Sequence, residues 1–282
     1  MNTNIETYTA NNDGFSISSS KVTGFFSMPE KHVHEKYEIY YLVSGERYYF
    51  IKDRFFKIKK GHLVFVNQGE LHKTTDADLP DHERILVYFK RDFVATSNGS
   101  MDRLLDLLHR KNHCVLGLSL KEQQVVEKII QDMNEEILKQ SLGFETCLQG
   151  LLMKLLVFIA RTMEHYDEHA YVSIRPKHEK VSEVVQYINA HYSELLAIPR
   201  ISELFYISPY YLSRIFKETT GFTLVEYVNN VRVREAQKLL SDKSLKVIQV
   251  AELSGFGSVA NFNRIFKDLA GCSPLNYRKS LK

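Results

Sequence analysis

Residues 208–227 read SPYYLSRIFKETTGFTLVEY, and residues 258–277 read SVANFNRIFKDLAGCSPLNY. Aligned without gaps, the two stretches share seven of twenty residues, including an Arg-Ile-Phe-Lys run and the glycine that follows it. A pattern that occurs twice, fifty residues apart, indicates a duplicated supersecondary unit rather than a solenoid. The fold of this region therefore depends on what one copy forms.

Each copy predicts a helix-turn-helix unit, over about residues 198–221 and 246–271. Ser208 and Ser258 are start signals for the second helix, because a serine side chain caps free backbone N–H groups. Gly221 and Gly271 are stop signals, since glycine adopts the left-handed conformation at a helix C-terminus. Apolar residues at helical spacing predict the buried faces. They are Ile201, Leu204, Phe205, Val247, Val250, Ala251 and Leu253 in the first helices, and Leu212, Ile215, Phe216, Thr219, Phe262, Ile265, Phe266 and Leu269 in the second.

The faces outside these apolar stripes are polar and basic. Their side chains supply the donors that recognise base edges and the charge that meets phosphate. For one such helix a solvated surface is an equal alternative, and two matched copies favour DNA binding. The outward residues are Tyr210, Tyr211, Ser213, Arg214 and Lys217 in the first copy, and Asn261, Asn263, Arg264 and Lys267 in the second.

A long helix is predicted between the two units. Thr223 and Glu226 have the spacing of a capping box, and a helical pattern continues to Leu240. About eighteen residues at 1.5 Å each give about 27 Å, close to the roughly 34 Å between successive major-groove turns on one side of B-DNA. One chain could therefore place two recognition helices in consecutive grooves.

Residues 178–282 resemble the DNA-binding domain of the AraC/XylS family of transcription regulators. The matching strings are Arg232-x-x-x-Ala236-x-x-Leu239-Leu240, Val250-Ala251-x-x-x-Gly255-Phe256, and Phe262-x-Arg264-x-Phe266-Lys267-x-x-x-Gly271-x-Ser273-Pro274-x-x-Tyr277-Arg278. The resemblance implies an all-α domain of seven helices. It also implies base contacts from Tyr210, Ser213, Arg214, Asn261, Asn263 and Arg264.

Composition separates the two halves of the chain. A length of 282 residues suits about two domains, and 44% apolar with 25% charged residues is ordinary for a globular protein. Residues 171–282 carry 16 Lys and Arg against 10 Asp and Glu, whereas residues 1–170 carry 21 against 24. The C-terminal half is therefore the one suited to a polyanion such as double-stranded DNA.

Cysteines and apolar runs exclude other classes. Cys114, Cys147 and Cys272 are odd in number and far apart, so they predict no disulfide framework and no cysteine-based metal site. The opening residues MNTNIE lack the basic and apolar parts of a secretory signal. The apolar run at 151–160 is interrupted by Lys154 and is too short to cross a bilayer. We expect a cytoplasmic protein without a membrane partner.

Residues 1–99 predict a β-rich domain. Short segments rich in aromatic and β-branched residues predict strands at 37–43, 47–51, 55–58, 63–66 and 85–89. Many short antiparallel strands favour a barrel or jelly roll. Aromatic residues crowd these strands and suit either a sugar-binding cavity or the core. They are Tyr40, Tyr41, Tyr48, Tyr49, Phe50, Phe55 and Phe56.

A histidine cluster lies within this domain. His32, His34 and Glu38 share parity, so on one strand they would point to one face, and His72 follows on a later segment. The strings His32-x-His34-x-x-x-Glu38-x6-Gly45 and Gly61-x5-Asn67-x-Gly69-x-x-His72 resemble the cupin signature, with Asn67 where the motif has Pro and Asp76 where it has Asn.

The cupin resemblance implies a divalent metal held by His32, His34, Glu38 and His72. In sensor domains of the AraC/XylS family, the same positions border a cavity that usually holds an organic effector and no metal. Three interpretations stay open: an effector site that includes Tyr40 with these four residues, a metal site, and hydrogen bonds internal to the barrel. No other cofactor is predicted.

Residues 100–168 predict helices at 101–108, 120–138 and 144–165. The third of these helices has an apolar face wider than one domain needs, so it covers the barrel or pairs two subunits, and the family resemblance implies a homodimer. Residues 169–179 combine charge with Pro176 and predict a linker to the DNA-binding domain at 180–282.

The predicted fold class is α+β multidomain, with a cupin-like barrel, a helical dimerisation segment and an all-α double helix-turn-helix domain. The predicted function is a sequence-specific transcription regulator, such as an activator that also contacts RNA polymerase. A small-molecule effector, for which a sugar is one class, would control it. The alternatives are a cupin metalloenzyme with a DNA-binding tether and an effector-independent DNA binder. We expect no enzymatic activity.

Overall fold

Buried residues form nearly continuous runs along the central N-terminal strands and follow helical spacing in the C-terminal third of the chain. The computed structural model describes residues 4–12, 14–26, 34–51, 54–110, 115–165 and 176–281. The chain divides into two compact units, Met1–Ile174 and Arg175–Lys282. Each unit is considered by itself.

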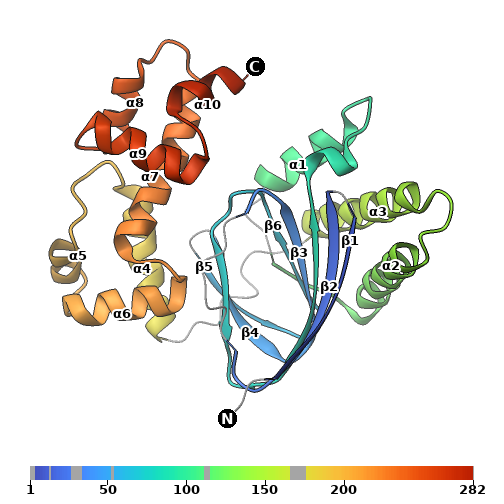
Figure 1. The fold of residues 1–282 in the computed structure, drawn as a ribbon. Coiled ribbons are helices and arrows are strands. Elements are labelled where there is room, and N and C mark those ends of the chain that lie inside the picture. The colour runs from blue at the N-terminus through green and yellow to red at the C-terminus, as the bar shows by residue number, and fades with distance from the viewer. Residues whose placement is uncertain are drawn as a thin grey trace. The chain divides into compact units, whose positions relative to one another are not determined.

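The described strands of the first unit form two antiparallel sheets (Figure 1). The larger sheet has the strand order β1-β2-β8-β3-β6-β9, and the smaller has the order β5-β4-β7. The strands are β1 (Asn4–Asn12), β2 (Phe15–Thr23), β3 (Tyr37–Ser44), β4 (Glu46–Ile51), β5 (Arg54–Lys59), β6 (His62–Val66), β7 (His72–Asp76), β8 (His82–Phe89) and β9 (Val115–Gly117).

Strand β3 contributes to two hydrophobic cores because successive side chains point to opposite faces. Ile39 and Tyr41 belong to the core on the helical side of the larger sheet. Tyr40 and Leu42 belong to a second core, together with residues of the smaller sheet such as Tyr49. This second core is the barrel interior.

Helices cover the outer face of the larger sheet (Figure 1). They are η1 (Arg91–Val94), α1 (Ser100–Arg110), α2 (Leu120–Lys139) and α3 (Phe144–Glu164). Helix α2 begins at a capping box formed by Ser119 and Glu122. Helix α3 is long and apolar enough to cross a membrane by length and composition, but its buried Leu148, Leu152 and Leu155 pack in the core. The core helix of a globular protein can have the same length and apolar composition, so these two properties do not by themselves indicate a membrane span.

Strands β1, β2, β7 and β9 were not among the predicted strands. Strand β2 carries three consecutive serines, Ser18 to Ser20, and β7 reads HKTTD, so neither has an apolar pattern. Strand β2 is held by pairing with β8 along its length, which is a tertiary effect. Strand β9 follows the expected domain boundary at residue 99 and pairs with β6, so the segment after 99 is not purely helical.

The second unit is helical throughout its described residues. Its seven helices there are α4 (Pro176–Ala190), α5 (Ile198–Leu204), α6 (Pro209–Thr220), α7 (Leu224–Leu240), α8 (Val247–Leu253), α9 (Val259–Ala270) and α10 (Pro274–Ser280). The predicted linker is wrong at its C-terminal end, because α4 already begins at Pro176, a residue that suits the first turn of a helix. The rest of the predicted linker, 169–175, lies outside the described residues.

Helix α7 connects the two helix-turn-helix units and packs against both. In its first half, Tyr227 contacts the ring of Phe216 in α6 at a centroid distance of 5.5 Å. In its second half, Val233, Ala236 and Leu240 share a core with Phe262 and Phe266 of α9. The predicted capping box of Thr223 and Glu226 is confirmed at its N-terminus.

The predicted helix boundaries of both units are confirmed. Ser208 and Ser258 accept hydrogen bonds from Tyr211 N and Asn261 N, and Gly221 and Gly271 have φ values of 84° and 73°. The predicted burial of Leu269 is wrong, since this side chain is 44% exposed; Leu204 and Leu253 are exposed as well. Helical spacing gives the direction of a side chain, whereas burial also requires a neighbouring element over that turn.

Candidate effector and DNA-binding sites

The outward faces of α6 and α9 carry the predicted DNA-binding residues. Each helix buries one stripe, so the opposite face is left to solvent. Eight of the nine predicted residues are exposed and Ser213 is half-buried. The exposed residues are Tyr210, Tyr211, Arg214, Lys217, Asn261, Asn263, Arg264 and Lys267.

Among the described residues, the two equivalent arginines contact only neighbours on their own helices. The Arg214 guanidinium lies 5.7 Å from the centre of the Tyr211 ring. Arg264 donates to Asn261 Oδ1 at 3.0 Å and lies 3.5 Å from Asp268 Oδ2. Contacts of this kind at an exposed surface contribute little stability, so both side chains can exchange them for a phosphate or a base.

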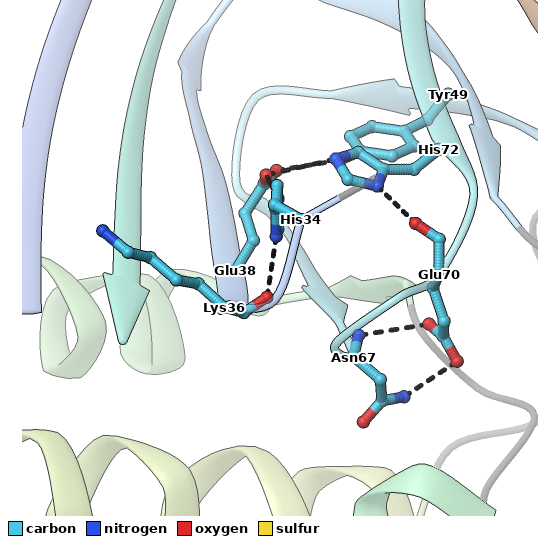
Figure 2. A network of polar contacts seen from close by, with 7 residues as sticks. All are labelled: His34, Lys36, Glu38, Tyr49, Asn67, Glu70 and His72. Carbon is cyan, nitrogen blue, oxygen red and sulfur yellow. Dashed lines mark hydrogen bonds and ion pairs between the residues drawn. The ribbon is translucent and has the colours of Figure 1, made fainter. Parts of the chain in front are cut away.

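In the barrel, Glu38 of β3 is the centre of a polar cluster (Figure 2). Its Oε2 atom lies 3.1 Å from His34 Nε2 and 3.2 Å from His72 Nε2. Its Oε1 atom accepts a hydrogen bond from the Tyr49 hydroxyl at 3.0 Å. Glu38 and His72 are buried, and His34 is partly exposed at 21% of its side chain. The cluster therefore lies at an accessible end of the barrel interior.

The backbone determines which ring nitrogens face Glu38. His34 Nδ1 lies 2.7 Å from the Lys36 carbonyl oxygen, and His72 Nδ1 lies 2.9 Å from the Glu70 carbonyl oxygen. A carbonyl only accepts, so each Nδ1 carries a proton and donates. In a neutral imidazole the Nε2 atom is then an acceptor that faces a carboxylate oxygen. This arrangement calls for a positive charge, either a second proton on the ring or a cation shared with Glu38.

Electrostatics in the cluster favour an ionised Glu38. Burial alone would raise the pKa of Glu38, yet the neighbouring His72 and His34 hold it well below its usual range. Burial alone would lower the pKa of His72, yet the Glu38 carboxylate raises it above its ordinary value. Burial and the same carboxylate raise the pKa of Tyr49, which therefore stays a hydroxyl donor.

A turn at residues 67–70 positions both histidines. Asn67 donates to the Glu70 carboxylate from its backbone N–H and from its side-chain amide, at 3.1 and 3.0 Å. Gly69 N donates to the His34 carbonyl at 3.0 Å with a φ of 70°. A proline at position 67 would lack the N–H, which explains why the cupin proline is absent where this carboxylate is used.

The donor set suits a divalent metal. One ligand atom from each of His34, Glu38 and His72 lies within 4.8 Å of the other two. Imidazole and carboxylate ligands at this spacing can surround an ion about 2 Å from each donor. The hydrogen bonds from both Nδ1 atoms to carbonyls are the usual support of metal-binding histidines. The fourth predicted ligand, His32, lies outside the described residues.

Sequence reasoning missed several polar residues of the barrel interior. Tyr40 was predicted and is buried there, next to Tyr49 at a ring distance of 5.3 Å. Tyr88 faces Glu38 directly across the β3–β8 pair, and Arg84 and Arg47 lie further along the interior. The alternation of β8, in which residues 82, 84, 86 and 88 share a face, could have identified two of them.

Two family models match the chain. Residues 25–156 match the AraC-like ligand binding domain, and residues 201–280 match a helix-turn-helix domain. The first match includes strands β3 to β9, helices α1 and α2 and most of α3, whereas β1 and β2 precede it. The second includes both recognition helices.

Similar proteins are transcription regulators. The HTH-type transcriptional regulator YisR of Bacillus subtilis is 24% identical over 91% of this chain and 91% of its own length. The melibiose operon regulatory protein of Escherichia coli is 24% identical over 89% of this chain and 84% of its own. These names support the expectation that the chain is not an enzyme.

Among solved structures, ToxT from Vibrio cholerae covers 96% of this chain and 99% of its own, at 15% identity and a TM-score of 0.38. The two family matches, the order of the two domains and the named relatives agree with the motifs of the recognition helices. The chain belongs to the AraC family of transcription regulators.

Proposed function

We propose that the two recognition helices α6 and α9 enter consecutive major grooves of one DNA duplex. The observation that carries this proposal is the matched pair of exposed basic faces at the two ends of α7. The 17 residues of α7 span about 26 Å, close to the roughly 34 Å of one helical turn of B-DNA. Arg214 and Arg264 are assigned to base contacts, and Lys217 and Lys267 to phosphates.

Site selection from a random DNA library, followed by gel shifts, tests this assignment. If Arg214 and Arg264 contact guanine, Arg214→Ala and Arg264→Ala each cost about 1–3 kcal/mol of binding free energy and relax specificity at one base pair. Arg103→Ala, an exposed arginine of α1, is the control and leaves binding unchanged. Unchanged affinity for both recognition-helix variants at moderate salt contradicts the proposal.

The barrel is proposed to bind the small molecule that controls DNA binding. Its interior combines aromatic rings with the cluster of His34, Glu38 and His72, and Tyr40 lies beside them. The relative named for the melibiose operon makes a sugar one effector class to test. An effector controls DNA binding only through different affinities for two arrangements of the protein, typically about 1–3 kcal/mol of coupling.

A divalent metal is a second candidate for the same cluster. The specific observation is that both Nε2 atoms and Glu38 Oε2 converge, with each Nδ1 committed to a carbonyl. When bound, a metal would supply a Lewis acid that an effector's oxygen atoms could coordinate. Elemental analysis of purified protein tests it. One ion per chain that disappears in His72→Ala, and persists in the exposed His109→Ala, supports the metal; no ion in the wild type contradicts it.

A homodimer is proposed through α2 and α3. Between them lies an open apolar cavity of about 700 Å³, lined by residues that include Val125, Ile129, Val157 and Phe158. Sedimentation equilibrium tests this surface, since Val157→Asp would give a monomer and Leu107→Asp, on the exposed side of α1, would not. A wild-type monomer contradicts it. Because the proposed partner is DNA, we infer a cytoplasmic location. If the protein is an activator, we expect it to contact RNA polymerase as well.

A further inference from the structure

A second polar region lies in the barrel interior, away from the Glu38 cluster along the strands. In β8 it contains His82 and Arg84, and in β4 and β7 it contains Arg47 opposite Asp76. Tyr40 and Thr74 point to the same interior face. Thr74 lies two residues from Asp76 on β7, and Tyr40 pairs with Leu86, which lies two residues from Arg84 on β8. This group of six residues is called the guanidinium end of the barrel.

One of the two guanidinium groups is balanced by a carboxylate. Arg47 is fully buried, and its Nη1 atom donates to Asp76 Oδ1 at 2.7 Å. It also donates to the Phe26 carbonyl, while Phe26 N donates to Asp76 at 2.7 Å. Asp76 is therefore committed to Arg47 and to the backbone next to it.

The other guanidinium has no carboxylate partner among the described residues. Arg84 lies between two aromatic rings, 5.9 Å from the centre of Phe26 and 5.9 Å from the centre of Tyr40. Its Nε atom is buried without a hydrogen-bond partner. The faces of two aromatic rings stabilise a cation only partly, because neither ring carries a full negative charge. The Glu38 carboxylate does not compensate it, since the two carboxylate oxygens face His34, His72 and the Tyr49 hydroxyl.

Further buried polar atoms at the guanidinium end also lack partners within the described part of the chain. They are the Tyr40 hydroxyl, Thr74 Oγ1 and both ring nitrogens of His82, on residues that are no more than 2% exposed. Buried polar groups are nearly always hydrogen-bonded, so several in one place indicate a water or ligand site. The local potential is positive as well, since burial and then Arg47 and Arg84 lower the pKa of His82 to about 4.

We propose that the effector of this protein is a small organic carboxylate, bound at the guanidinium end by Arg84 and the Tyr40 and Thr74 hydroxyls. This inference rests on the proposed effector role of the barrel and narrows it to anions. A carboxylate has two oxygens, which match the planar guanidinium donors, and a nearby hydroxyl can donate to the same group. Arg84 is partly exposed, so a ligand can reach it.

Thermal unfolding of the full chain with matched probes tests the proposal. D-Glucuronate and D-glucose differ by one carboxylate, and acetate is the smallest probe of the subsite. We expect D-glucuronate and acetate to raise Tm saturably, by roughly 5 °C at concentrations far above Kd, and D-glucose to have no such effect. In Arg84→Met and Arg84→Gln the rise is lost, while Arg103→Met on α1 retains it.

Two results overturn the proposal. One is a wild type whose Tm responds to neither anion, or equally to D-glucose. The other is an anion response that persists in both Arg84 variants. A gel shift without any probe keeps this test separate from the DNA-binding proposal: DNA binding with no anion response refutes the carboxylate alone, whereas failure of specific DNA binding refutes the regulator function.

Discussion

At the residue scale, charged groups lie at two places in the barrel interior, and the pKa of the histidine at each place is shifted in the opposite direction. At one end, Glu38 and His72 favour each other's charged forms. At the other end, His82 is buried beside Arg47 and Arg84 and is kept neutral. The pKa of a histidine is therefore raised in one part of the barrel and lowered in another, because the neighbouring charges have opposite signs.

His82 makes the stability of the barrel depend on pH. Its folded-state pKa of about 4 lies below the ordinary 6.5, so between these values the unfolded chain binds the extra proton and the folded chain does not. The contribution of His82 to the free energy of unfolding is fully present above pH 6.5 and is lost as the pH falls toward 4. At pH 5 the loss from this group is on the order of 2 kcal/mol.

Urea unfolding followed by circular dichroism at pH 7.5 and pH 5 measures this effect. Other groups titrate in the same range, so the comparison is between the wild type and His82→Gln. We expect the wild type to lose about 2 kcal/mol more than the variant on going to pH 5. Equal losses in both proteins contradict a neutral, buried His82.

At the element scale, the spacing of the two helix-turn-helix units depends on a close backbone approach. Gly255 follows α8 with a φ of 82°, and a Cβ there would lie 2.6 Å from Ser193 Cα and from the Tyr192 carbonyl oxygen. Arg232 of α7 donates to the same Tyr192 carbonyl at 2.7 Å. The turn after α4 is thereby held against the second helix-turn-helix unit and against α7.

Gly255→Ala is expected to destabilise the second unit by about 2–4 kcal/mol, because it adds left-handed strain and a clash with backbone atoms. DNA affinity should fall with it, since the recognition helices lose their fixed spacing. Gly257→Ala is the matched control, as a Cβ at that position has no atom within 4 Å. Chemical denaturation measures the free energy of unfolding of both variants. Equal values would contradict the prediction, because they would show that the turn accommodates the added methyl group without loss of stability.

At the scale of the whole molecule, charge is divided between the halves. The excess of Lys and Arg lies in residues 171–282, and the first 170 residues carry a small excess of Asp and Glu. A basic DNA-binding unit releases counterions from DNA, so binding weakens as salt rises. An acidic partner domain does not add to this non-specific attraction.

The salt dependence of DNA binding should report the phosphate contacts. Replacing Lys217 and Lys267 together by Gln is expected to reduce the slope of log K against log salt by about 2, uniformly across DNA sequences. Fluorescence anisotropy over a range of salt concentrations measures it. Lys128→Gln with Lys139→Gln on α2 is the control, since these lysines already pair with Asp132 and Glu135. An unchanged slope in the Lys217 and Lys267 variant would remove them from the phosphate contacts.

Local sequence signals were sufficient to predict the helical half of this protein. Helix caps, stop glycines and apolar stripes are local signals that act within one or two turns, so the recognition helices and their outward residues followed from spacing alone. The family motifs in the two helix-turn-helix units likewise predicted the DNA-binding role. The error at Leu269 arose where burial required a neighbour that spacing cannot supply.

The composition of the barrel interior could not be predicted before the pairing of the strands was known. Arg47 and Asp76 are 29 residues apart, and Arg84 contacts the ring of Tyr40 from a different strand. Which charges share one interior depends on strand pairing and register, and a shift of one residue would turn each side chain to the opposite face. The histidine motif could therefore be found in the sequence, whereas the guanidinium end became visible only once β4, β7 and β8 were paired.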